Sequence, residues 1–134
     1  MSVVELEIPP KTPYVGVVRL AMSSLARNAG LDEERVDDLK IAVSEACANA
    51  VINNEEAGSA DPVAVTWTDE GQQIRIEVGD RGRADSFPGP DEVDTQGFST
   101  RAVMSMALLR SLVDGCEFVP RAGGGITTRL TLNL

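Results

Sequence analysis

The chain has 134 residues and a formal net charge of −9, and 43% of its residues are hydrophobic. This length fits a single core, so we expect residues 1–134 to form one domain. Lys and Arg number 12 against 21 Asp and Glu, which argues against direct nucleic-acid binding, because phosphate backbones are bound through clustered basic side chains.

Neither a membrane segment nor an export signal is evident in the sequence. No apolar run is long enough to span a bilayer, and the first residues lack the basic and apolar regions of a signal peptide. We therefore expect a cytoplasmic protein. The two cysteines, Cys47 and Cys116, form no C-x-x-C pair, and the chain contains no histidine. The usual zinc ligand sets cannot be assembled, so we expect both thiols to be reduced and buried.

The N-terminal half predicts a strand followed by two helices. Residues 3–8 alternate apolar and polar side chains, as in a half-buried strand, and prolines then interrupt the chain. Apolar residues recur at helical spacing over residues 14–28, with Gly30 as the expected helix terminator. Asp32 is placed to cap a second helix over residues 33–53. The apolar residues expected on its buried side are Val36, Leu39, Val43, Ala46 and Ala50.

The C-terminal half predicts a hairpin, a long loop, a helix and two strands. Alternating patterns at 63–68 and 73–78, joined by Asp-Glu-Gly, are typical of a β-hairpin. Residues 79–97 are rich in glycine and acidic residues and are expected to form a long loop, often a functional one. The helix and the strands are expected at 100–112, 117–119 and 126–133. This order predicts an α/β two-layer sandwich, with helices on one face of a mixed, mostly antiparallel sheet.

Three polar residues of the second helix, Glu45, Asn49 and Asn53, are spaced four positions apart. They project from nearly one side, away from the apolar stripe. Asparagine is unfavourable inside a helix because its side chain competes for backbone hydrogen bonds, so the pattern needs a reason. One interpretation is chemical: an amide oxygen suits Mg²⁺ among phosphates, and a carboxylate one turn away suits a general base. The other interpretation is a solvated polar helix face.

A second motif, Val-Gly-Asp-Arg-Gly-Arg, follows the strand expected at 73–78. Asp80 is placed to accept hydrogen bonds from a ring amine, and Gly82 would allow a planar base to approach closely. The same Asp-x-Gly pattern after a strand is also typical of an ordinary turn, so the motif alone does not decide between the two.

Together these motifs resemble the nucleotide site of the GHKL ATPase superfamily (the Bergerat fold, HATPase_c-like). That site combines Glu-x-x-x-Asn on a helix, a hairpin, and Asp-x-Gly entering a long loop. The chain is most similar to the stand-alone anti-sigma-factor serine kinases, through Val-Ser-Glu-Ala-Cys-Ala-Asn-Ala at 43–50 and Leu-x-x-Leu-Val-Asp at 109–114. The resemblance covers essentially the whole chain and implies the Bergerat ATP-binding fold.

The resemblance implies a role for each residue of the two motifs. Glu45 would be the general base that accepts the proton of a partner's serine. Asn49 would ligate Mg²⁺, and Asn53, one turn further on, would lie near the phosphates. Asp80 would bind the adenine amine, with Gly82 beside the ring.

Further positions follow from the same resemblance. Thr127 on the last strand would support the adenine site through water, with Thr128 as its neighbour. Arg19 on the first helix matches a position where relatives carry an arginine near their partner surfaces. An ordinary solvated arginine is the alternative for Arg19.

One departure from the family pattern concerns the second glycine motif, whose backbone amides hold phosphates. Its two glycines fall on Val103 and Ser105 here, and valine lacks the conformational freedom of glycine. Gly97 lies upstream and is a candidate to replace part of that function, and Arg101 is a candidate to supply charge.

Two functions remain open at this point. The resemblance implies an anti-sigma factor that binds ATP and Mg²⁺, sequesters a sigma factor and phosphorylates a serine of a STAS-type anti-anti-sigma protein. Such a protein would be a homodimer that regulates transcription during stress. The alternative is a binding module that keeps the fold and the protein partners but binds nucleotide weakly or not at all and has no kinase activity. The replaced glycines favour this alternative. The catalytic domain of a sensor histidine kinase is disfavoured, because the chain has no histidine and no sensor segment.

Overall fold

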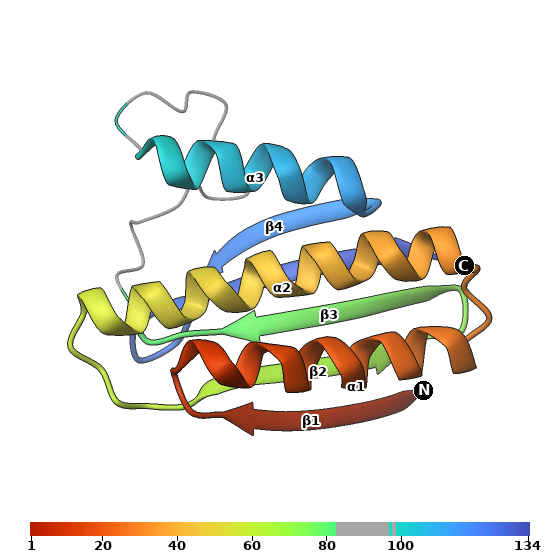
Figure 1. The fold of residues 1–134 in the computed structure, drawn as a ribbon, viewed down its shortest axis with the longest axis horizontal. Coiled ribbons are helices and arrows are strands. Elements are labelled where there is room, and N and C mark those ends of the chain that lie inside the picture. The colour runs from red at the N-terminus through yellow and green to blue at the C-terminus, as the bar shows by residue number, and fades with distance from the viewer. Residues whose placement is uncertain (83–96, 98) are drawn as a thin grey trace.

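The computed structural model describes residues 1–82, 97 and 99–134 (Figure 1). Its elements in chain order are β1 (Ser2–Ile8), η1 (Thr12–Tyr14), α1 (Val15–Asn28), α2 (Glu33–Glu56), β2 (Val63–Asp69), β3 (Gln73–Gly79), α3 (Thr100–Leu112), β4 (Gly115–Pro120) and β5 (Ile126–Asn133). Every strand and α-helix expected from the sequence is present, and the short 3₁₀ turn η1 was not expected. Most of the loop expected over residues 79–97 lies outside the described residues.

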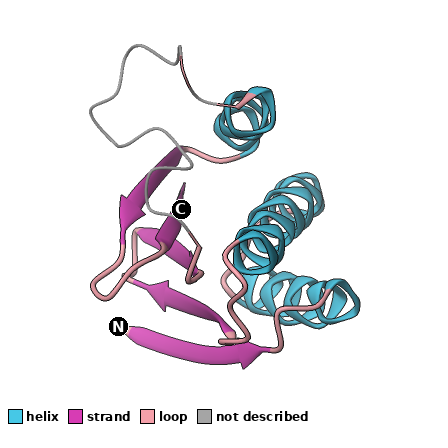
Figure 2. Cartoon of the chain, turned by 90° about the vertical axis from the view of Figure 1, so that its left-hand side faces the viewer, coloured by secondary structure: helices cyan, strands magenta, loops and turns pink. Residues whose placement is uncertain are grey.

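The strands form one layer and the helices the other (Figures 1 and 2). The sheet has the order β1-β2-β3-β5-β4, so the last strand of the chain lies between β3 and β4. This confirms the α/β two-layer sandwich with helices on one face. The expectation of a mixed sheet is wrong for the described strands, because all four neighbouring pairs are antiparallel.

The antiparallel pairing follows from how the chain returns to the sheet. The helices α1 and α2 run back and forth along it, so β2 starts at the end where β1 stops (Figure 1). In the same way, α3 and β4 follow β3 in the chain and come before β5. Each of them crosses the sheet once, so β5 runs opposite to its neighbour β3. When two elements that each run the length of the sheet separate two neighbouring strands in the chain, the second strand begins at the end where the first one stops. Such a pair is therefore antiparallel.

Local signals fix where the first two helices end and begin. Gly30 has φ +94°, in the left-handed region that glycine adopts without strain, and its N–H bonds to the carbonyl of Arg27 at 3.1 Å. The side chain of Asp32 accepts a hydrogen bond from the N–H of Arg35 at 2.9 Å. Both residues therefore act as predicted, as terminator of α1 and cap of α2.

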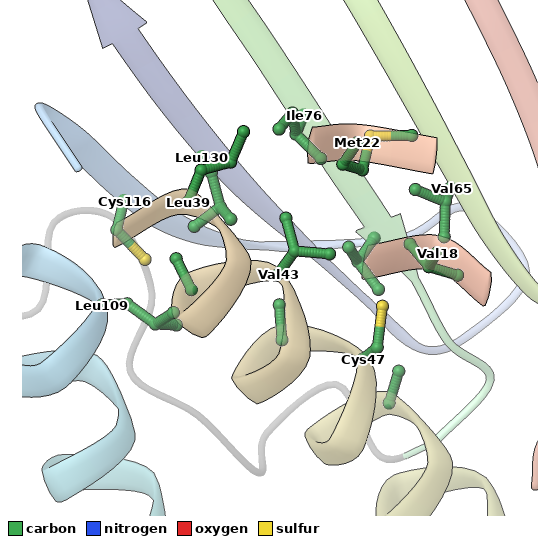
Figure 3. Packing of buried hydrophobic residues seen from close by; sticks show 14 of the residues in the cluster. Val18, Met22, Leu39, Val43, Cys47, Val65, Ile76, Leu109, Cys116 and Leu130 are labelled. Carbon is green, nitrogen blue, oxygen red and sulfur yellow. The ribbon is translucent and has the colours of Figure 1, made fainter. Parts of the chain in front are cut away.

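The core lies between the two layers. All five apolar residues expected on the buried side of α2 are buried. Figure 3 shows buried side chains from α1, α2 and the sheet that pack together in this core. They are Val18 and Met22 of α1, Leu39, Val43 and Cys47 of α2, and Val65, Ile76 and Leu130 of the sheet. On the side of α3, Leu109 packs beside Cys116 of β4 (Figure 3). No helix among the described residues is long and apolar enough to cross a membrane.

Both cysteines are free and buried, with exposed fractions of 0% for Cys47 and 7% for Cys116. Burial raises the pKa of the Cys47 thiol to about 12 and that of Cys116 to about 11. Since the thiolate is the reactive form, we expect neither thiol to react with a disulfide reagent at pH 8 in the folded protein. Both should react once guanidinium unfolds the chain. A colorimetric thiol assay checks this, and stoichiometric reaction of the folded chain would contradict it.

Candidate functional site

A buried polar network joins α2, α3 and the segment after β3. Its central side chains, Asn49, Asn53 and Asp80, have exposed fractions of 4%, 3% and 3%. The two asparagines project from α2 one turn apart, and Asp80 directly follows β3. The interpretation of this side of α2 as a solvated polar face is therefore wrong for both asparagines.

Three hydrogen bonds hold the carboxylate of Asp80. Its Oδ1 accepts from the backbone N–H of Gly82 at 2.9 Å and from that of Ile126 at 3.1 Å. Its Oδ2 accepts from Asn53 Nδ2 at 2.9 Å. A buried carboxylate requires such partners because its burial without them is strongly unfavourable. An ionised carboxylate offers about four acceptor positions, so Asp80 retains capacity for one more donor.

Two glycines allow the chain to come this close to Asp80. A Cβ on Gly125 would lie 2.0 Å from the carbonyl oxygen of Asp80, and Gly125 has φ +103°. A Cβ on Gly82 would lie 2.5 Å from Cβ of Asn53. Gly82 therefore lets the segment after β3 lie directly against α2. The space that a side chain would fill there is taken by α2. A place for Gly82 beside an adenine ring stays a prediction.

Asn54 and two arginines, which the sequence analysis did not single out, anchor the same segment. Asn54 is 0% exposed, and its Oδ1 accepts from the N–H of Arg81 at 2.7 Å. Arg121 donates from Nη1 to the carbonyl of Asp80 at 2.8 Å. Burial, and then the charge of Arg81, lower the pKa of the Arg121 guanidinium. The only sequence signal for Asn54 was the second asparagine of a pair inside a helix.

Two residues of α3 complete the network. Asn49 Nδ2 donates to Oγ of Ser105, which is 2% exposed. Arg101 donates from Nη1 to Asn49 Oδ1 at 2.9 Å and from Nη2 to Asn53 Oδ1 at 3.3 Å. Arg101 Nη2 also lies 3.9 Å from a carboxylate oxygen of Glu56. The structure thus brings the predicted Arg101 to both predicted asparagines, and it places Ser105 where a glycine was expected.

Glu45 lies outside this network. It is half-buried and lines a groove of about 920 Å³ formed by η1, α1 and α2. Within the part of the chain that the structure describes, Glu45 makes no hydrogen bond or ion pair. Arg19 lines the same groove and donates to Oγ of Ser44 at 2.7 Å. Glu45 is therefore presented to the groove, one helical turn from Asn49.

The two threonines of β5 face opposite sides of the sheet. Thr128 is 6% exposed and alternates with the buried Ile126 and Leu130, so it shares their helix-facing side. Thr127 pairs with Gly79 and points to the other side. The structure therefore places Thr128, rather than the predicted Thr127, on the side of the network. A role of Thr128 in supporting adenine stays a prediction.

The other two predicted positions near α3 are less enclosed. Gly97 is exposed and has φ +93°, which glycine adopts without strain. Val103 is half-buried on α3. Neither makes a side-chain contribution to the network, and a phosphate-binding role for Gly97 stays a prediction.

The donor set of the network fits a nucleotide with its metal ion. The amide oxygens of Asn49 and Asn53 converge on one cationic group, and such hard oxygens are ligands suited to Mg²⁺. The buried carboxylate of Asp80 suits an amine donor, because it is fixed in place and has acceptor capacity left. The network therefore offers the kinds of groups that hold a nucleotide with its metal ion, where β3 ends beside α2 and α3.

The sequence matches a known family over most of its length. Residues 8–132 match the histidine kinase-like ATPase domain, and the chain belongs to this family.

Several curated relatives of the chain are named serine-protein kinases. The chain is 33% identical to the serine-protein kinase RsbW of Bacillus pumilus (strain SAFR-032) over 141 residues, covering 98% of this chain and 85% of the relative. It is 36% identical to the RsbW of Bacillus subtilis (strain 168) over 84 residues, covering 63% of this chain and 51% of that protein. These matches confirm the resemblance to the anti-sigma serine kinases of the GHKL superfamily.

A solved structure agrees with the fold. The crystal structure of the RsbU and RsbW domains of a Mycobacterium tuberculosis protein matches with a TM-score of 0.74 and 20% sequence identity. The match covers 100% of this chain and 33% of that larger chain. At this identity it shows the fold alone. Family membership as a whole supports ATP use and a general role related to the serine-protein kinases.

Proposed function

We propose that the chain binds ATP with Mg²⁺ at the network of Asn49, Asn53 and Asp80. In this proposal it phosphorylates a serine of an anti-anti-sigma protein and sequesters a sigma factor. The observation that carries the proposal is the buried Asp80 carboxylate, which two backbone N–H groups and Asn53 orient beside the polar side of α2. An aspartate fixed in this way is suited to select the amine of an adenine ring.

Each residue has a defined task in this proposal. Asp80 accepts a hydrogen bond from the adenine amine, and Thr128 faces the same side of the sheet. Asn49 contributes its amide oxygen to Mg²⁺, which when bound neutralises phosphate charge during phosphoryl transfer. Glu45 accepts the proton of the incoming serine hydroxyl. Because Glu45 lines the groove between α1 and α2, the partner that delivers the serine has to cover that groove.

The binding module is the second candidate, and α3 provides the observation that favours it. Ser105 occupies a glycine position of the phosphate-binding motif and bonds to the expected metal ligand Asn49. Transfer of radiolabelled phosphate from ATP to a cognate anti-anti-sigma protein, run beside a sigma-factor pull-down, separates the two candidates. Sigma-factor capture without any transfer favours the binding module, and transfer favours the kinase.

The homodimer implied by the family resemblance and the cytoplasmic location expected from the sequence belong to the same proposal. We expect a cytoplasmic homodimer whose partners are proteins and not nucleic acid or membrane. Sedimentation of the purified chain gives its mass in solution, and a monomer at all accessible concentrations would contradict the dimer.

Asp80→Asn is expected to weaken nucleotide binding. The NH₂ group of the new amide would face either Asn53 Nδ2 or the backbone N–H groups of Gly82 and Ile126. Because all of these groups donate, at least one buried hydrogen bond would be lost and two donors would face each other. The loss is about 1–3 kcal/mol, the usual effect of a mismatched buried polar group. Calorimetric titration with Mg-ATP and Mg-ADP measures it.

The matched control is Glu117→Gln, which makes the equivalent carboxylate-to-amide change on the exposed side of β4. This control should bind like the wild type. Equal affinities for Asp80→Asn and wild type, with both folded by circular dichroism, would remove Asp80 from the site.

A further inference from the structure

Arg101 is the part of the network that the proposed function leaves unexplained. It reaches from the first turn of α3 to α2 and donates to the side-chain oxygens of Asn49 and Asn53 at 2.9 and 3.3 Å. One of these atoms, Asn49 Oδ1, is the oxygen assigned to the metal ion. The guanidinium therefore stands at the position from which a cation contacts this oxygen.

The orientation of both asparagine side chains follows from their partners. An arginine only donates hydrogen bonds, so the amide group that faces Arg101 has to present its oxygen. Asn53 is fixed independently, because its Nδ2 donates to the acceptor-only carboxylate of Asp80. Asn49 is oriented by Arg101 alone, because the hydroxyl of Ser105 at its other end is able both to donate and to accept. Two amide oxygens thus converge on one positive group, with Glu56 as a more distant anion.

We infer that Arg101 is a built-in competitor of the divalent cation at Asn49. Its side chain and the Mg²⁺ of a nucleotide exclude one another there, because both require the same amide oxygen and both are positively charged. Nucleotide with Mg²⁺ then binds only when Arg101 releases Asn49. This inference rests on the proposed nucleotide site, and it adds a residue that sets the affinity of that site.

The competition has two effects of opposite sign. With no nucleotide added, Arg101 supplies the donors for two otherwise buried amide oxygens and so stabilises the packing of α3 on α2. With Mg-nucleotide added, the same contacts have to be broken and oppose binding. A residue with only a structural role would lower stability and affinity together when substituted, so the two measurements distinguish the roles.

Arg101→Met is the direct test, because methionine keeps much of the aliphatic reach and removes every donor. We expect its midpoint of thermal unfolding without nucleotide to fall below that of the wild type. We expect its affinity for Mg-ADP, measured by calorimetry, to rise about tenfold, the effect of losing competing charge-assisted hydrogen bonds. With ADP in EDTA the affinity should not rise, since no divalent cation then competes for Asn49.

Two further variants control the test. Arg110→Met removes an exposed arginine from the last turn of the same helix and should change neither quantity. Arg101→Lys keeps the charge but loses the planar fork, so its affinity for Mg-ADP should rise less. It replaces Arg101→Met if that variant does not fold.

The outcomes separate this inference from the proposed function. If Arg101→Met binds Mg-ADP no better than the wild type, or more weakly, the competition is refuted and Arg101 serves as a phosphate ligand or a structural residue. The proposed function then still stands, provided that the wild type binds Mg-ADP and Asp80→Asn binds it less well. If no variant binds nucleotide under any condition, both fail. Binding by Arg101→Met alone would support the inference most strongly.

Discussion

Glu45→Gln is expected to reduce phosphoryl transfer to the partner serine by about 10²–10⁴-fold, the usual contribution of a positioned general base. Glutamine has nearly the same shape but cannot accept the proton of the serine hydroxyl. Glu45 makes no hydrogen bond or ion pair to the described residues, so its replacement should leave the fold and the buried network unchanged. Radiolabel transfer from ATP measures the rate, and calorimetry should show an unchanged affinity for Mg-ADP.

The control for this variant is Glu55→Gln, the same change at an exposed position near the end of α2. It should transfer phosphate at the wild-type rate, and both variants should still capture the sigma factor. Equal transfer rates for Glu45→Gln and Glu55→Gln would show that Glu45 is not the base, while leaving the nucleotide site in place.

Gly125→Ala should be the most damaging single-methyl substitution near the site. A Cβ there would lie 2.0 Å from the carbonyl oxygen of Asp80, and φ is +103°. Backbone strain and overpacking together are expected to lower the free energy of unfolding by about 3 kcal/mol or more. For a domain of this size the midpoint of thermal unfolding should fall by roughly 10 °C. Differential scanning calorimetry measures both quantities.

Gly124→Ala is a closely matched control. Gly124 has the same φ of +103°, but a Cβ there would meet nothing within 4 Å. Its substitution should cost only the backbone strain, about 1 kcal/mol. The difference between the two variants isolates the contact with Asp80. If both variants lose the same stability, the close approach of Gly125 to the carbonyl oxygen of Asp80 does not matter for folding.

The fold was predictable because its signals are local. Helix ends depended on residues such as Gly30 and Asp32, whose effects reach only a few positions along the chain. Strands were marked by alternating apolar and polar residues. This pattern arises because every second side chain of a strand faces the single layer of helices and is buried there. The mostly antiparallel pairing was predicted as well, but the order of the strands in the sheet was not. That order depends on the insertion of β5, the last described strand, between β3 and β4.

The site was predicted in part for a related reason. Asn49, Asn53 and Asp80 were found because they belong to short motifs. Arg101 was named through the family resemblance, but its contacts with the two asparagines were not. Ser105 and Ile126 also come from distant parts of the chain, and nothing in the spacing of residues indicates their contacts.

Glu45 was grouped with the asparagines, yet it lines a different feature. Each step of four residues turns about 40° around a helix. One such step, from Glu45 to Asn49, is enough to pass from the groove to the network.

The central position of β5 has a consequence for the order in which the protein becomes competent during synthesis. β5 leaves the ribosome after the other four strands of the sheet, yet it lies between β3 and β4 and supplies the N–H of Ile126 to Asp80. Until then β3 lacks its second neighbour, and the carboxylate of Asp80 lacks one of the donors that orient it. A nascent chain therefore holds no finished site until residues 126–133 have left the ribosome and joined the sheet.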